Sequence, residues 1–198
     1  MIMSSKDITD KKQNTLKFIV ILILLAAFSR LIPHPHNFTP VGGIAIFGSY
    51  FIGRKIWAFA IPIIAMWLSD LFINNVIYPI QYTEYYGFNL FGSIWVYGSF
   101  LLMVPIGWLI LNRVSIPKLA LTGFLTATLF FLITNFGSWI NNPIYPQNYM
   151  GLMASYAAGL PFFQNTLLGD LSYLAILFGI TKVFGASLTP IYGKNVMI

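Results

Sequence analysis

The chain has 198 residues, of which 58% are hydrophobic and only 8% are charged, and its formal net charge is +6. A soluble domain carries about 25% charged residues, so this composition excludes a water-covered globular fold and predicts an integral membrane protein. The chain contains no cysteine, which excludes disulfides, thiolate metal sites and a cysteine nucleophile.

The apolar runs predict a single all-α transmembrane domain over residues 17–184, between polar tails at 1–16 and 185–198. A bilayer core takes roughly 20 apolar residues per helical crossing, which leaves room for about six crossings joined by short loops. The expected helices span residues 17–32, 41–52, 56–74, 90–111, 119–140 and 165–184. The second is short and rich in glycine and other small residues, which let helix backbones approach closely in lipid.

One further apolar segment, at 150–163, is interrupted by Gly159 and Pro161. The segment is short for a bilayer crossing, so we expect a re-entrant or interfacial helix there. The last spanning helix would then begin at Asn165, whose side chain suits an N-cap. If the segment did cross, the chain would have seven spans.

The basic residues predict which side of the membrane each loop faces, because cytoplasmic loops are enriched in lysine and arginine. With a cytoplasmic N-terminus and six crossings, every basic residue except Arg30 lies in the cytoplasm: Lys6, Lys11, Lys12, Lys17, Arg54, Lys55, Arg113, Lys118, Lys182 and Lys194. A seventh crossing would move the last two outside. We therefore expect both termini in the cytoplasm of a multi-pass protein of the bacterial inner membrane. The positive charge then reports orientation, and no nucleic-acid partner is expected.

Apart from the cytoplasmic lysines at the inner ends, three charged residues fall inside predicted helices, namely Arg30, Asp70 and Asp170, and the expected topology puts all three in the outer third of the membrane. A charge at the bilayer centre costs roughly 2.5–3.5 kcal/mol on insertion scales, so such residues usually face a partner or a cavity. Two interpretations stay open: a structural ion pair of Arg30 with either aspartate, or the floor of an outward-facing ligand site. Because two acids face one base, one carboxylate must be protonated, held by hydroxyl and amide donors, or balanced by a cation.

Uncharged polar residues gather at the same end, among them Asn37, Asn135 and Asn165. Each alone is more typical of a cap or a helix–helix hydrogen bond, but together they extend the candidate ligand site. His34 and His36, in the first outer loop, are weak candidates for metal ligands, and a solvated loop pair is the plainer interpretation. No G-x-S-x-G, H-E-x-x-H, Walker A or G-x-G-x-x-G motif occurs, so we expect neither an enzyme nor a cofactor.

Five stretches of the chain resemble an uncharacterised bacterial family of six-helix membrane proteins: residues 29–35, 37–41, 68–70, 130–139 and 161–170. More distantly, the size, the six helices and the polar outer end are similar to S components, the substrate-binding subunits of energy-coupling factor (ECF) transporters. This resemblance implies uptake of a vitamin or a metal ion. It also implies a partner module of one membrane scaffold subunit and two ATPases.

The leading hypothesis is therefore a subunit in the lipid bilayer that binds a small micronutrient from the outer side for uptake. The candidate ligand-binding residues are Arg30, Asn37, Asp70, Asn135, Asn165 and Asp170. One alternative is a structural or assembly membrane protein in which the same residues tie the bundle together. The other is an ion-gradient-driven carrier, which an unpaired carboxylate would suit.

Overall fold

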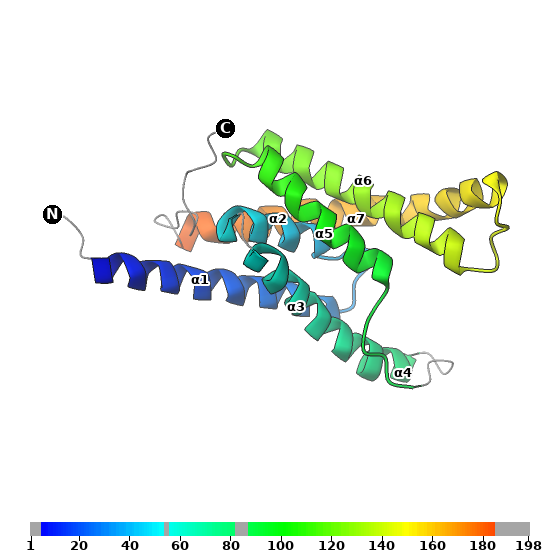
Figure 1. Ribbon diagram of the computed structural model, residues 1–198, viewed down its shortest axis with the longest axis horizontal. Helices are drawn as coiled ribbons and strands as arrows, with labels where there is room; N and C mark the ends of the chain where they lie inside the picture. The colour runs from blue at the N-terminus through cyan, green and yellow to red at the C-terminus, as the bar shows by residue number, and fades with distance from the viewer. Residues whose placement is uncertain (1–4, 54–55, 82–86, 185–198) are drawn as a thin grey trace.

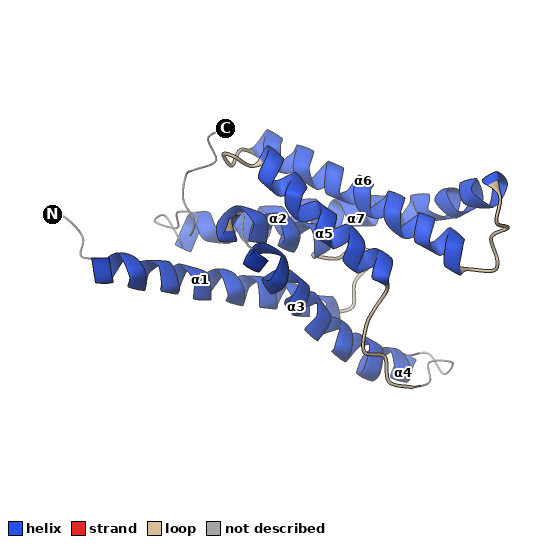
Figure 2. Cartoon of the chain, in the orientation of Figure 1, coloured by secondary structure: helices blue, strands red, loops and turns tan. Residues whose placement is uncertain are grey.

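The computed structural model describes residues 5–53, 56–81 and 87–184, and over these residues the secondary structure is entirely helical (Figure 2). The helices are α1 (Ser5–Phe28), α2 (Val41–Ile52), α3 (Ile56–Phe72), α4 (Tyr78–Gln81), α5 (Ile94–Ile110), α6 (Ile116–Asn141) and α7 (Tyr149–Phe184). A short 3-10 turn, η1 (Ser29–Leu31), extends α1, and a π-helical turn, η2 (Ile73–Ile77), joins α3 to α4. The predicted all-α class is confirmed.

Four helical stretches in the described part of the chain are long and apolar enough to cross a membrane: Thr9–Leu31, Ile56–Ile80, Ile116–Asn141 and Tyr149–Val183. They indicate a membrane protein. The other two apolar helices, α2 with 12 residues and α5 with 17, are shorter than the roughly 20 residues that a crossing takes. Six apolar helical rods are therefore present as predicted, but only four have the length of a full span.

The short helix α2 lies in the middle of the bundle, where α1, α3, α5 and α7 surround it (Figure 1). Every residue of α2 except Tyr50 is buried. Gly43 allows the close approach of α7, because a Cβ atom there would lie 2.8 Å from the Cβ of Tyr173. On the opposite side, Trp108 of α5 donates its indole N–H to the carbonyl oxygen of Ser49 at 3.1 Å. Since other helices cover it, α2 does not need to span a bilayer to be stable in one.

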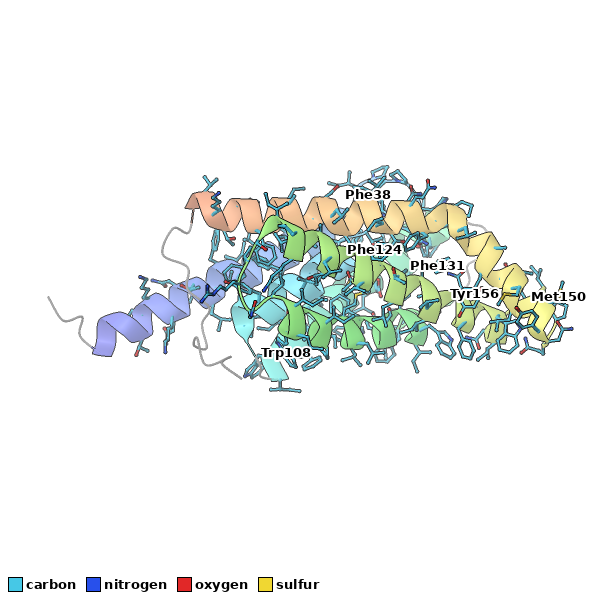
Figure 3. The ribbon with its side chains drawn as sticks, turned by 90° about the horizontal axis from the view of Figure 1, so that it is seen from above. Phe38, Trp108, Phe124, Phe131, Met150 and Tyr156 are labelled. Carbon is cyan, nitrogen blue, oxygen red and sulfur yellow. The ribbon has the colours of Figure 1, made fainter. Side chains whose placement is uncertain are left out.

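Helix α7 corrects the prediction of a separate re-entrant helix at 150–163. The helix runs unbroken for 36 residues through Pro161, and its first part bends away from the remainder (Figure 3). Proline removes one helical hydrogen bond and typically kinks a helix, but contacts with α6 hold the two parts of α7 in one rod. Tyr156 donates to the carbonyl oxygen of Leu132 at 3.1 Å, and its ring packs 5.7 Å from that of Phe131. Asn165 lies inside this helix and is not its N-cap.

The first helix also begins earlier than predicted. Helix α1 starts at Ser5, so the boundary expected at residue 17, between a polar tail and the membrane domain, falls inside one continuous helix. Its N-terminal part projects past the bundle, at the same end as the C-terminus of α7 and the connection between α5 and α6 (Figure 1). The predicted tail at 185–198 and the basic residues Arg54 and Lys55 lie outside the described residues.

Candidate functional site

Arg30 and Asp70 form an ion pair that joins η1 to α3. The Nη1 atom of Arg30 lies 2.5 Å from Oδ1 of Asp70, and the two side chains are only 14% and 7% exposed. The same Nη1 atom lies 3.0 Å from the Ser69 hydroxyl oxygen. From α5, the Tyr97 hydroxyl donates to Oδ2 of Asp70 at 2.6 Å. Both carboxylate oxygens therefore have donors, and one aspartate connects three elements.

A cavity of about 270 Å³ lies beside this ion pair. Its lining combines the pair with amide, hydroxyl and aromatic side chains: Arg30, Asp70, Asn74, Tyr78, Asn89, Phe91, Gly92, Ser93 and Val96. All hydrogen bonds of Arg30 within the described residues start from Nη1, so Nη2 and Nε keep their donor capacity. The cavity therefore offers N–H donors from the Arg30 guanidinium and from side-chain amides. Asp70 already balances the positive charge of Arg30.

The π-helical turn η2 shapes one wall of this cavity. Asn75, within the turn, donates to the carbonyl oxygen of Asn89 at 2.9 Å, and its own side-chain oxygen accepts the Asn89 backbone N–H at 2.7 Å. This reciprocal pair fixes the segment before α5 against η2. The neighbouring residue Asn74 lines the cavity. Single π-helical turns occur frequently at functional sites because they displace a side chain from the regular helical position.

Asp170 makes its contacts elsewhere, at the N-terminus of α2. One carboxylate oxygen accepts the backbone N–H of Gly42 at 3.0 Å, and the other accepts the hydroxyl of Thr126 from α6, also at 3.0 Å. The side chain is 1% exposed. A negative group is stabilised at a helix N-terminus by the unpaired N–H groups and the helix dipole. The sequence left three possibilities open for the carboxylate without a basic partner: protonation, hydroxyl and amide donors, or a cation. The contacts of Asp170 are of the second kind, a backbone amide and a hydroxyl.

The charged residues are thus divided between two places, with Arg30 and Asp70 in contact and Asp170 bonded to other partners. A Cβ atom at position 42 would lie 2.1 Å from an Asp170 oxygen, so only glycine fits between the helix and the carboxylate. Sequence reasoning missed Tyr97, Asn74, Asn75 and Asn89. The adjacent asparagines shortly after Asp70 were the signal that could have pointed to this cavity.

Two of the predicted asparagines, Asn37 and Asn135, lie together at a separate small cavity of about 60 Å³. That volume suits a few water molecules, since one water needs roughly 10–15 Å³ of such space. Asn135 donates to the carbonyl oxygen of Phe131 in its own helix at 2.7 Å. Asn165 instead donates to the carbonyl oxygen of His36 at 2.9 Å, which ties α7 to the connection between η1 and α2. These contacts position helices and loops.

The two histidines do not meet. The Nδ1 atom of His34 lies 2.6 Å from the carbonyl oxygen of Ile32, whereas the ring of His36 stands edge-on to that of Phe162, with centroids 6.3 Å apart. Among the residues that the structure describes, no three His, Cys, Asp or Glu side chains are grouped so that they could hold a metal ion.

Comparison with protein families identifies one match: a family of unknown function, DUF6580, whose model covers residues 10–191. The matched region includes nearly all of the helical bundle, and the expectation of an uncharacterised family is met. No curated protein and no solved structure matches the chain, and nothing in these comparisons connects it with S components of ECF transporters.

Proposed function

The chain belongs to this family of unknown function, and from its own geometry we propose that it is a membrane subunit that binds a small polar solute for uptake. The observation that carries the proposal is the cavity beside Arg30. It is lined by the Asn74 side chain and by a guanidinium group that uses only its Nη1 atom in the hydrogen bonds to Ser69 and Asp70. Arginine can serve two acceptors at once because its five N–H donors form a fixed fork.

The orientation belongs to the proposal. The described basic residues away from Arg30 lie in α1 up to Lys17, in the connection between α5 and α6 and the first turn of α6, and near the C-terminus of α7. The start of α1, this connection and the end of α7 share one end of the bundle (Figure 1). Under the positive-inside rule this end faces the cytoplasm. The Arg30 cavity then opens toward the outer side of a bacterial inner membrane, where a micronutrient would enter.

The chemistry of the cavity favours a ligand that carries a carboxylate or phosphate group. Asp70 already has Arg30 and Tyr97 as donors, so the cavity does not require a cationic ligand. Its volume of about 270 Å³ is just below the usual range of roughly 300–1,000 Å³ for ligand pockets, which restricts the ligand to a small molecule. The sequence carries no nucleotide-binding motif, so an ECF-type scaffold and ATPase module is the proposed energy source.

Binding to the purified protein tests this proposal. A panel of small carboxylates, phosphates and anionic vitamins is titrated by calorimetry, and at least one is expected to bind. Arg30→Lys keeps a positive charge opposite Asp70 but loses the guanidinium fork, so we expect binding to weaken about tenfold or more while the protein stays folded. Asn74→Ala should weaken binding too, whereas Asn14→Ala, which removes an exposed amide from α1, should not.

A structural or assembly protein is the second candidate, and one observation favours it: the carboxylate oxygens of both Asp70 and Asp170 bond to protein donors. Under that alternative no compound in the panel binds, and Arg30→Ala and Asp170→Ala each destabilise the protein because they remove a tie within the bundle, whereas Asn14→Ala does not. A gradient-driven carrier has less support, because the carboxylate that suggested it contacts Gly42 and Thr126.

A further inference from the structure

Another cavity, of about 740 Å³, lies at the end of the bundle where α1 begins and α7 ends. It is a groove between the last turns of α7 (orange in Figure 1) and the first turns of α6, and the end of α2 closes its inner side. Phe51, Leu119, Ala120 and Phe178 contribute to its apolar walls. A groove of this volume falls within the range of small-molecule and cofactor sites.

The length of the groove matches one leaflet of a bilayer. It follows α7 from Leu171 to Lys182, which corresponds to roughly 16 Å at the helical rise of about 1.5 Å per residue. The hydrocarbon core of a bilayer is about 30 Å thick, so one leaflet contributes about half of that. Leu171 directly follows the buried Asp170, and the groove ends there.

The charge at the groove is positive. Lys182 lines it near the end of α7, and the lining contains no aspartate or glutamate. Val114, Ser115 and Leu119 line its other side, and their chain neighbours Arg113 and Lys118 add positive charge to the same end of α6, where Lys118 hydrogen-bonds to the side-chain oxygen of Asn112. An apolar slot with cations at the membrane surface is complementary to a lipid that has a hydrocarbon chain and an anionic headgroup.

We propose that this groove binds one anionic phospholipid of the cytoplasmic leaflet, with an acyl chain along α7 and the phosphate beside Lys182. The inference rests on the membrane orientation given under the proposed function, but it does not depend on a ligand at Arg30. Gly179 marks the open part of the groove, because a Cβ atom there would meet nothing within 4 Å.

Gly179→Leu tests the acyl-chain part of the site, since Gly179 lines the groove and a Cβ atom there would meet no atom within 4 Å, which leaves room for a larger side chain to occupy lipid-binding space. Gly98→Leu is the matched control: it also lies inside a helix with nothing within 4 Å of its Cβ, but on α5 and outside the groove lining. The purified variants are equilibrated with phosphatidylglycerol or phosphatidylcholine, and retained lipid is counted by native mass spectrometry. We expect one phosphatidylglycerol on the wild-type protein and on Gly98→Leu, and about tenfold less on Gly179→Leu.

Lys182→Gln tests the headgroup part and changes only an exposed side chain. This variant should lose the preference for phosphatidylglycerol over phosphatidylcholine. Equal retention of lipid by Gly179→Leu and Gly98→Leu would overturn the proposal, as would a wild-type protein without headgroup preference or a groove occupied by a second copy of the chain. None of these results affects solute binding at Asn74, so the two proposals fail independently.

Discussion

At the scale of single residues, the two buried aspartates are stabilised in different ways. Asp70 faces a guanidinium, whereas Asp170 has only neutral donors, the Gly42 N–H and the Thr126 hydroxyl. Transfer of a charge into an apolar interior is costly unless hydrogen bonds and partners compensate for lost water. The helix N-terminus supplies that compensation for Asp170, since it presents several N–H groups that have no acceptor within α2.

Asp170→Asn is expected to destabilise the protein by roughly 1.5–3 kcal/mol, the usual worth of a hydrogen bond to a charged group. The substitution keeps the size of the side chain but removes its negative charge: the amide oxygen can still accept the Gly42 N–H, and the amide NH2 then faces the Thr126 hydroxyl, which can accept a hydrogen bond but no longer donates one to a carboxylate. Equilibrium unfolding in detergent micelles measures the effect. Asn14→Ala serves as the control, and an Asp170→Asn variant as stable as the wild type would show that the cap contributes little.

At the scale of elements, close contact between α6 and α7 explains why α7 continues through its proline. Gly159 lies against Asn135, and a Cβ atom there would lie 2.2 Å from the amide oxygen of that residue. Ser155, one turn earlier, donates to the carbonyl oxygen of Asn135 at 2.7 Å. The bent first part of α7 is therefore held along its length by α6.

Gly159→Ala should consequently destabilise the protein by about 1–3 kcal/mol, because the new methyl group would displace the Asn135 side chain from its hydrogen bond to the Phe131 carbonyl oxygen. In a helix without such a contact, the same substitution is expected to be neutral or favourable by roughly 0.5–1 kcal/mol. Gly98→Ala on α5 provides that comparison, since nothing lies within 4 Å of its Cβ. Thermal unfolding of both variants under identical conditions measures the difference, and equal midpoints would contradict the assigned contact.

Apolar runs predicted the helices well, because hydrophobicity is a local property of the sequence. The expected range of 41–52 coincides with α2, and 56–74 covers α3 and the start of η2. Gly159 and Pro161 were misleading, since local rules treat them as helix breakers, whereas packing on α6 keeps α7 continuous. Candidate residues were found by their unusual position inside apolar segments, but their partners were not: Asp170 and Gly42 are 128 residues apart, and no spacing rule connects them.

At the scale of the whole molecule, the bundle has two chemically distinct regions. One end carries both termini of the described chain and the lysines at 118 and 182 (Figure 1), whereas the Arg30 cavity lies away from that end, between η1, the turn from α3 to α4 and the segment before α5. Large apolar side chains between these regions are exposed, including Leu25, Leu121 and Ile176. This distribution suits a bilayer, where apolar surface needs no cover.

The absence of cysteine makes the proposed orientation directly testable, because single cysteines can be introduced without background. Asn141→Cys lies at the end of α6 that we place outside, and Asn112→Cys lies in the connection between α5 and α6 that we place inside. In intact cells a membrane-impermeant maleimide should label only the first. Labelling of the second requires permeabilised cells, and the reverse pattern would invert the topology.

The position of α2 has a consequence for how the protein is made. One of its N-terminal amides donates to a carboxylate of α7, which is synthesised after all the other described helices, so a ribosome must have translated α7 before the centre of the bundle is complete. Until then, a short glycine-rich segment has neither the length to insert stably by itself nor an acceptor at its start. Premature termination anywhere before codon 170 should therefore give a product that membrane proteases remove.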